Sequence, residues 1–244
     1  MKKIYIIGGV IGIVVLISIG IYLFRVPNDN KVEYTEVLVN DNIVTSLYNM
    51  VNPSDEVTFL YDRYHSLTFT DEYILGCALA LYDKENSGLN QTLSADDVLL
   101  YVHKIFGDIS YENTSGSFTS DHFTKFTYDE NTNTYQCRKE SVENNTEFMV
   151  RKVIAAKKTR TDYIITEKSI VVAPDHKEMP EESSLTIYDD VSHSNTLDVI
   201  SYTSEDYPTV SIENYIDQAE TYEYHFTFDG ENFVLKSFQK VANQ

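Results

Sequence analysis

Residues 4–24 form one uninterrupted uncharged run, "IYIIGGVIGIVVLISIGIYLF", and this run limits the possible folds of the chain more than any other feature. A helix of about 20 apolar residues crosses a hydrocarbon core of about 30 Å. Within a bilayer, a single segment can satisfy its backbone polar groups only as a helix. The sequence therefore predicts a transmembrane signal-anchor over residues 1–25, which contacts the membrane through residues 4–24.

The charges beside the run predict its orientation, because Lys and Arg near the ends of a span stay on the cytoplasmic side. Lys2, Lys3 and the α-amino group precede the run, whereas Arg25 and Lys31 follow it among acidic residues. We therefore expect a single-pass protein of the cell membrane with a cytoplasmic N-terminus and an extracytoplasmic C-terminal domain. A cleaved signal peptide is one alternative, since residues 18–20 are a small-x-small triplet, and a buried core helix is another.

The chain beyond the run is strongly acidic. After Arg25 it has 16 basic against 38 acidic residues, a net charge of −22. Such a domain repels nucleic acid and anionic lipid, because both require clustered positive charge. A nucleic-acid partner is therefore excluded. Solubility is the simplest role for the acidity, and a surface that gathers cations or binds a basic partner is the alternative.

Apolar residues recur at helical spacing in the first half of the domain. After a linker over residues 26–40, the predicted helices cover residues 41–51, from Thr70 to Tyr82, and from Ser94 to Gly107. Thr70 and Ser94 are the expected N-caps, because a hydroxyl at that position accepts a hydrogen bond from a free N–H of the first turn.

After Gly107 the apolar residues alternate with a period of two, which is typical of β-strands. The predicted strands are 122–128, 134–140, 147–157, 162–173, 184–189, 197–203, 221–228 and 232–241. Asp229-Gly230 is suited to a tight hairpin turn between the last two strands, because glycine accepts a positive φ.

The strand 221–228 shows the alternation most clearly, with Tyr222, Tyr224, Phe226 and Phe228 on one face. This pattern favours an antiparallel sheet with one packed and one wet face. The tyrosines could stack a sugar ring, but packing in the sheet is the simpler role for strand tyrosines.

Helices followed by strands predict an α+β fold. We expect an N-terminal transmembrane helix, then about three helices, then a curved antiparallel β-sheet of six to eight strands. The extracytoplasmic α+β domain spans residues 41–244. Residues 174–210, rich in Glu, Asp and Ser, form a possible insertion or subdomain boundary, and residues 211–220 a possible short helix.

The chain also resembles a known group of proteins. The segments that carry the resemblance are the N-terminal span, "VLLYVHKIFGD" at 98–108, a Tyr-Asp turn, and "YEYHFTFDGENFVLKSFQKV" at 222–241. They look like the uncharacterised, N-terminally membrane-anchored extracytoplasmic proteins of low-GC Gram-positive bacteria. The closing hairpin is similar in manner to the end of cone-shaped NTF2-like domains. The resemblance implies a location in the cell envelope and transfers no functional residue.

The segment "DENTNTYQCRKE" matches a calcium-binding EF-hand loop at four ligand positions, which are Asp129, Asn131, Asn133 and Glu140. An EF-hand loop also needs glycine at its sixth position and a helix on each side. Here the sixth residue is Thr134 and the flanks alternate like strands. We therefore expect a hairpin turn at 129–133, with Glu140 roughly 20 Å away along an extended strand. The sequence thus predicts no metal site.

Cys77 and Cys137 are the two cysteines of the chain and allow one intramolecular pairing. An exported domain could oxidise them, so a disulfide and a pair of thiols both stay open. Neither cysteine has the spacing of a zinc site.

The remaining candidates for chemistry are isolated residues. His176 and His193 flank acidic residues that could gather a cation. Ser237 and Lys240 form a Ser-x-x-Lys match within a predicted strand and without the companion motifs of serine acyl-enzymes. The sequence nominates no catalytic residue and no cofactor.

Two classes of function follow from these observations. The first is a non-catalytic binding or accessory module, tethered to the membrane, with a protein or an envelope component as its partner. The second is an envelope hydrolase that uses paired carboxylates as acid and base. A cation-responsive module built on the acidic loops is a third class. The absence of a catalytic motif favours the binding module.

Overall fold

The computed structural model describes residues 32–52, 69–86, 92–119, 123–140, 147–175, 183–203 and 208–241. The predicted anchor, residues 1–25, lies outside these segments and stays a prediction. Within them, no helix is both long enough and apolar enough to cross a bilayer. The residues from Tyr34 onward belong to one structural unit.

The three predicted helices are confirmed as α2 (Asn42–Val51), α4 (Asp71–Asn86) and α5 (Ala95–Phe106). Their starts follow from local hydrogen bonds. The Thr70 hydroxyl accepts from the backbone N–H of Tyr73 at 3.1 Å, and the Ser94 hydroxyl accepts from that of Asp97 at 3.0 Å. Both residues therefore cap their helices as the sequence predicted.

The strands form two antiparallel sheets. The four-stranded sheet has the order β2 (Thr92–Ser94), β5 (Thr134–Glu140), β4 (Phe123–Asp129), β3 (Gly116–Thr119). The main path of the seven-stranded sheet is β1 (Thr35–Val37), β6 (Phe148–Lys158), β7 (Asp162–Asp175), β10 (Glu220–Phe228), β11 (Phe233–Val241). Off this path, β8 (Ser183–Tyr188) pairs with β7 and with β9 (Thr196–Tyr202).

The predicted fold class is wrong in its architecture. We expected helices followed by one curved sheet, but the described strands outnumber the helices, form two separate sheets, and also precede and interrupt the helices. β1 lies in the predicted linker, and β2 lies between α4 and α5. Both are three residues long, too short to show an alternating pattern. The sheet that a strand joins depends on contacts between distant segments, which periodicity does not encode.

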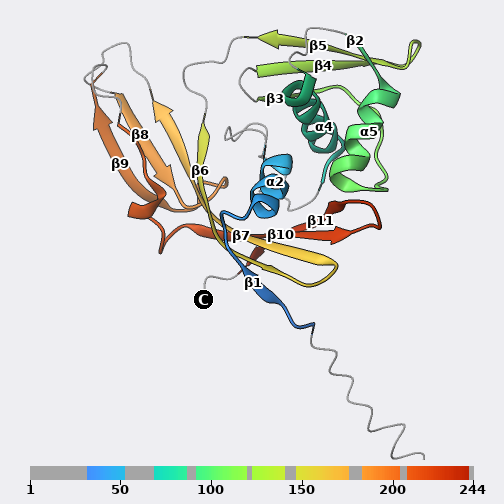
Figure 1. Ribbon diagram of the computed structural model, residues 1–244. Coiled ribbons are helices and arrows are strands. Elements are labelled where there is room, and N and C mark those ends of the chain that lie inside the picture. The colour runs from blue at the N-terminus through green and yellow to red at the C-terminus, as the bar shows by residue number, and fades with distance from the viewer. Residues whose placement is uncertain are drawn as a thin grey trace, which may run out of the picture. The chain divides into compact units, whose positions relative to one another are not determined.

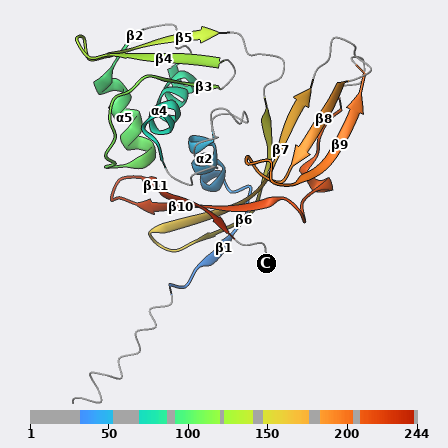
Figure 2. The same cartoon turned by 180° about the vertical axis from the view of Figure 1, so that it is seen from behind.

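The helices lie between the two sheets. In both views α4 and α5 separate the four-stranded sheet from β10 and β11 (Figure 1; Figure 2). α5 packs on β2 and β11, and α4 packs on β3. From Tyr73 to Leu81 every residue of α4 is buried. A helix that is apolar on all sides is stable where neighbours cover all of it, and the position between the sheets provides that cover.

The alternation predicted for residues 221–228 is confirmed in β10 from Tyr222 to Thr227, whereas Thr221 is buried and Phe228 is exposed. Tyr222, Tyr224 and Phe226 are at most 1% exposed in the core, whereas Glu223 and His225 point to the other face. These tyrosines pack in the core, so sugar stacking on them is excluded in this fold. The predicted turn is also present, since Gly230 has a φ of 114°.

β7 pairs with three strands. It pairs with β6, and in addition its first half pairs with β10 and its second half with β8. The β8–β9 hairpin, which falls in the possible insertion 174–210, thus extends the main sheet. Small clusters of buried side chains hold this hairpin. One cluster consists of Ile170, Ile187, Ile212, Tyr215 and Ala219, and its Ile212 lies in the 3₁₀ helix Ile212–Asn214. Of the predicted helix 211–220, this single 3₁₀ turn is present.

Gly107 ends α5 with a φ of 68° and a ψ of −145°, a combination that glycine alone adopts readily. A Cβ at this position would lie 3.2 Å from Cγ2 of Val234, on the facing strand β11. We expect Gly107→Ala to lower the free energy of unfolding by about 1–3 kcal/mol, measured by urea denaturation. Gly230→Ala is the control, because its Cβ would meet no atom within 4 Å. Equal losses in the two variants would show that contact with β11 adds nothing to the backbone strain.

Candidate functional site

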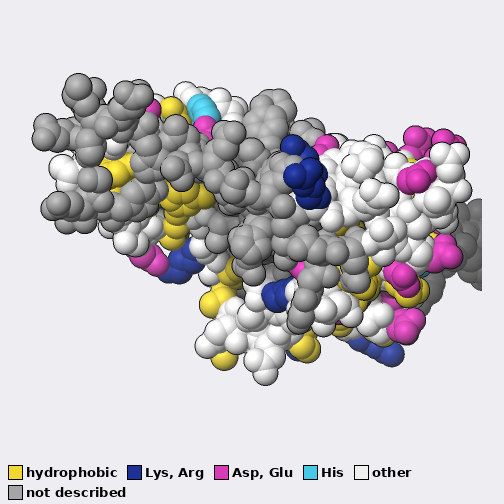
Figure 3. All heavy atoms as spheres, turned by 90° about the horizontal axis from the view of Figure 1, so that it is seen from above, with side chains coloured by type: hydrophobic (Ala, Val, Ile, Leu, Met, Phe, Trp, Pro, Cys, Tyr) yellow, Lys and Arg dark blue, Asp and Glu magenta, His cyan; other side chains and the backbone are white. Residues whose placement is uncertain are grey.

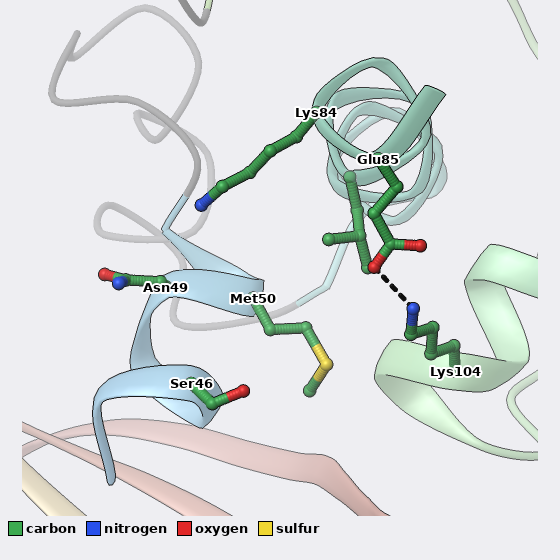
Figure 4. A pocket seen from close by; sticks show the side chains of 7 residues that line it. Ser46, Asn49, Met50, Lys84, Glu85 and Lys104 are labelled. Atoms are coloured by element: carbon green, nitrogen blue, oxygen red, sulfur yellow. Dashed lines mark hydrogen bonds and ion pairs between the residues drawn. The ribbon is translucent and has the colours of Figure 1, made fainter. Parts of the chain in front are cut away.

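An open pocket of about 420 Å³ lies where α2, α4 and α5 meet (Figure 4). The residues that line it are Ser46, Asn49, Met50, Leu81, Lys84, Glu85 and Lys104. Small-molecule sites are hollows of roughly 300–1,000 Å³ in which a few polar groups stand among apolar ones. The pocket has both properties, which makes it the candidate functional site.

The spacing of residues along α2 explains how this helix contributes to the pocket. Val44, Leu47 and Val51 are buried on one face of the helix. Asn49 and Met50 lie three and four positions after Ser46, so both are neighbours of Ser46 on a second face of the helix. The first face holds the helix on the core while the second lines the pocket.

Lys84 and Lys104 lie in the last turns of α4 and α5. Basic side chains are favoured there, because the last carbonyl groups of a helix carry partial negative charge. Lys104 Nζ lies 2.5 Å from the carboxylate oxygen Oε1 of Glu85, and both side chains are about half exposed. An exposed ion pair of this kind contributes about 0–1 kcal/mol, so a ligand could compete for Lys104.

A buried polar network lies on the sheet side of α2. Glu167, on β7, is completely buried, and its Oε2 accepts a hydrogen bond from the Tyr224 hydroxyl at 2.9 Å and another from the Tyr48 hydroxyl. Asn52 Oδ1 accepts from Arg151 Nη1 at 2.6 Å. These bonds tie the C-terminal half of α2 to β6, β7 and β10, so they also position the face of α2 that lines the pocket.

A second hollow, of about 450 Å³, lies beside the end of α5 and the β10–β11 turn. Asp108, Asp229 and Glu231 contribute three carboxylates to its lining. Backbone N–H groups of Asn232 and Glu231 donate to Asp229 at 2.9 Å each and hold the pKa of its carboxyl group below its usual value. Asp229 therefore stabilises the β10–β11 turn in which it lies.

Five carboxyl groups of the described residues have a displaced pKa, and in each the pKa is lowered: Asp129, Asp162, Asp190, Glu223 and Asp229. Burial by itself would raise the pKa of Asp190 and of Glu223. Hydrogen bonds from Ser192 and Lys240 outweigh burial at Asp190, and those from Gln239 and His225, with the charge of Lys157, outweigh it at Glu223. A general acid near neutral pH needs the opposite shift, so these carboxylates suit structural roles.

The EF-hand-like segment is the β4–β5 hairpin, as predicted. Asp129 and Thr134 are the last pair before the turn, and Asn133 has a φ of 52°. Asp129 Oδ1 accepts from the N–H of Asn131 at 2.9 Å. Glu140 pairs with Phe123 at the opposite end of the hairpin, too far from the turn to share a metal ion with it.

The acidic residues near His193 are engaged within the β8–β9 turn. Asp190 Oδ1 accepts from the backbone N–H of Ser192 at 2.9 Å, and its Oδ2 lies 3.2 Å from Lys240 Nζ. His193 stacks on Tyr188 with ring centroids 4.1 Å apart, while His176 lies outside the described residues. The described residues hold no group of three or more metal-ligating side chains.

The Ser-x-x-Lys match gives no acyl-enzyme geometry. Ser237 and Lys240 lie in strand β11, as predicted, with an odd spacing that directs neighbouring side chains to opposite faces. Lys240 forms ion pairs with Glu220 at 3.1 Å and with Asp190 at 3.2 Å. Its ammonium group is thus held by two carboxylates away from Ser237.

Cys77 and Cys137 are both buried and are not joined in a disulfide. Burial raises the pKa of the Cys137 thiol to about 11, and the nearby charge of Asp83 adds to the rise. We expect neither thiol of the folded protein to react with a disulfide reagent at pH 8, because the thiolate is the reactive form. Both should react once guanidinium unfolds the chain, which is the control. Rapid labelling without denaturant would contradict the burial of these side chains.

The sequence did not point to the pocket residues, because they form no motif. One feature of the sequence could have indicated them, which is the position of the few basic residues. Between residues 34 and 120 the basic residues are Arg63, Lys84 and Lys104, and two of these three line the pocket. Comparisons of the chain with protein-family models, with curated proteins and with solved structures gave no match.

Proposed function

We propose that this protein is a non-catalytic binding module of the cell envelope, tethered to the membrane by residues 1–25. The observation that carries the proposal is the pocket between α2, α4 and α5, whose lining combines an apolar floor with two ammonium groups, a hydroxyl and an amide. Groups of these kinds recognise a ligand through charge, hydrogen bonding and contact area. Its one carboxylate, Glu85, is paired with Lys104.

The carboxyl groups support binding over hydrolysis. A glycoside hydrolase of the paired-carboxylate type needs one carboxyl group with a raised pKa as its acid. Where the pKa of a described carboxyl group is displaced, it is lowered, because the carboxylate accepts hydrogen bonds or lies near a positive charge. An enzyme of that class would require an acid that none of these groups provides.

The distribution of exposed apolar side chains supports the tether. The first described segment carries Val32, Tyr34, Leu38, Val39 and Ile43, all more than a third exposed. This segment begins eight residues after Phe24, the end of the apolar run. Exposed apolar side chains often mark a surface that contacts a membrane or a partner.

The proposal is tested by locating both ends of the full-length chain in cells. With an epitope at each end, we expect the protein in the membrane fraction, resistant to carbonate extraction and retaining the N-terminal epitope. Protease added to intact cells should remove the C-terminal epitope. Loss of that epitope only after lysis would overturn the orientation, and release of a form without residues 1–25 would favour a cleaved signal peptide.

A further inference from the structure

We propose that the pocket between α2, α4 and α5 binds a small soluble molecule with an anionic head group, a carboxylate or a phosphate, and a short apolar portion. This inference rests on the proposed binding function and names the class of ligand for its pocket. Three observations support the inference: basic residues are few in the helical part of the chain, two of them line this pocket, and the other lining residues suit an organic anion.

The first observation is the concentration of positive charge. The chain after Arg25 has a net charge of −22, and residues 34–120 contain three basic side chains. Two of them, Lys84 and Lys104, come from different helices and line the same pocket. Among the described residues on the face seen in Figure 3, the basic side chains stand in separate places. A hollow with more ammonium than carboxylate groups is therefore unusual for this molecule and favours an anion.

The second observation is the arrangement of the charges in the pocket. Glu85 is paired with Lys104, whereas Lys84 extends from α4 across the pocket toward α2 (Figure 4). Lys84 makes no ion pair with another described residue. The pocket thus presents one ammonium group whose charge is not already matched by a described residue, which fits an anionic head group.

The third observation is the chemistry of the other residues that line the pocket. The Ser46 hydroxyl and the Asn49 amide can each donate a hydrogen bond to an anionic oxygen. Met50 and Leu81 provide apolar surface, and methionine adapts to ligands of irregular shape. An ion without an apolar portion would leave this surface exposed to water, so the pocket favours an organic anion over inorganic phosphate.

A structural role for the two lysines is the competing explanation. Lysine near a helix C-terminus stabilises the helix through the partial charges of the last carbonyl groups. Those carbonyl groups are themselves repulsive to an anion, so the ammonium groups must supply the charge attraction that holds an anion here. The two explanations therefore differ in what removal of Lys84 does to ligand binding.

The test uses four-carbon probes that differ in head group: butanoate, butylammonium and 1-butanol, with inorganic phosphate as the ion alone. Binding to the purified full-length chain in nonionic detergent is followed by titration calorimetry. We expect butanoate to bind more tightly than the other three. Equal or tighter binding of butylammonium would overturn the proposal, as would failure of butanoate to bind at any concentration.

Charge-neutralising variants then locate the site. Lys84→Gln should weaken butanoate binding by about fivefold, and Glu85→Gln should strengthen it, because it removes a negative charge and releases Lys104. The matched controls are Arg160→Gln and Glu130→Gln, which make the same charge changes at exposed positions in the β6–β7 and β4–β5 turns. If the controls shift the affinity as much as the pocket variants, the site is not this pocket.

The same samples separate this inference from the proposed function. Butanoate binding that follows the order of the variants supports the pocket, whatever membrane location the epitope experiment gives. Absence of binding with the expected topology would overturn the ligand class and leave the tethered module standing. An organic anion recovered from the protein in chemically altered form would overturn the non-catalytic function while confirming the site.

Discussion

Phe226→Ala should lower the free energy of unfolding by about 3–5 kcal/mol, because a fully buried ring is removed and its neighbours can close the cavity only in part. Phe226 is 0% exposed on β10, on the core face that it shares with Tyr222 and Tyr224. Urea denaturation followed by circular dichroism measures the loss. Because most single domains are stable by 5–15 kcal/mol, the variant should have a strongly lowered unfolding midpoint.

Phe228→Ala is the matched control on the same strand. Phe228 is 41% exposed at the end of β10, where it contacts Phe233 with ring centroids 5.4 Å apart. Its replacement should cost about 1 kcal/mol or less. The sequence places Phe226 and Phe228 on the same face, so the difference between them tests which part of β10 the helices cover. Similar losses for the two variants would contradict that arrangement.

Glu167→Ala should lower the free energy of unfolding by about 2–4 kcal/mol. Glu167 is completely buried and accepts hydrogen bonds from the Tyr224 and Tyr48 hydroxyls. A buried hydrogen bond contributes about 0.5–1.5 kcal/mol, and a buried donor that loses its acceptor costs about 1–3 kcal/mol more. Tyr48 would lose the acceptor Glu167 Oε2, whereas Tyr224 would keep Asn52 Oδ1 at 3.2 Å. Chemical denaturation is the measurement, with the same reference as for Phe226.

Two further variants make the Glu167 prediction specific. Glu167→Gln keeps the shape and one acceptor oxygen, so it should cost less than Glu167→Ala. Glu130→Ala, in the exposed β4–β5 turn, should change stability by less than about 0.5 kcal/mol. Because the network also holds α2, Glu167→Ala should weaken butanoate binding in the α2–α4–α5 pocket. Unchanged stability in Glu167→Ala would show that the network contributes no net free energy.

The helices and hairpin turns could be predicted because their causes are local. Thr70 and Ser94 begin their helices with hydrogen bonds to residues three positions later. The Asp229-Gly230 turn and the hairpin at Asp129 likewise depend on the conformations that these residues accept. The apolar spacing of 3.6 in the helices and of two in the strands reports which side of each element is packed.

The two sheets could not be predicted, because strand pairing joins residues that are distant along the chain. β2 pairs with β5 some forty positions later, and β1 pairs with β6 more than a hundred positions later. A single strand carries the alternation but no information on its partner. The burial of Glu167 was hidden for the same reason, since its partners Tyr48 and Tyr224 come from α2 and β10.

The sequence by itself determined the three helices and the longer strands, the helix caps and hairpin turns, the acidity of the chain, and an apolar run of membrane-spanning length at its start. These properties depend on residues within a few positions of one another, and on composition. Tertiary structure alone decided that the strands divide into two sheets with the helices between them, and that Lys84 and Lys104 share a pocket with Ser46 of α2. Sites of this kind form where separate elements pack together, and packing is a property of the whole fold.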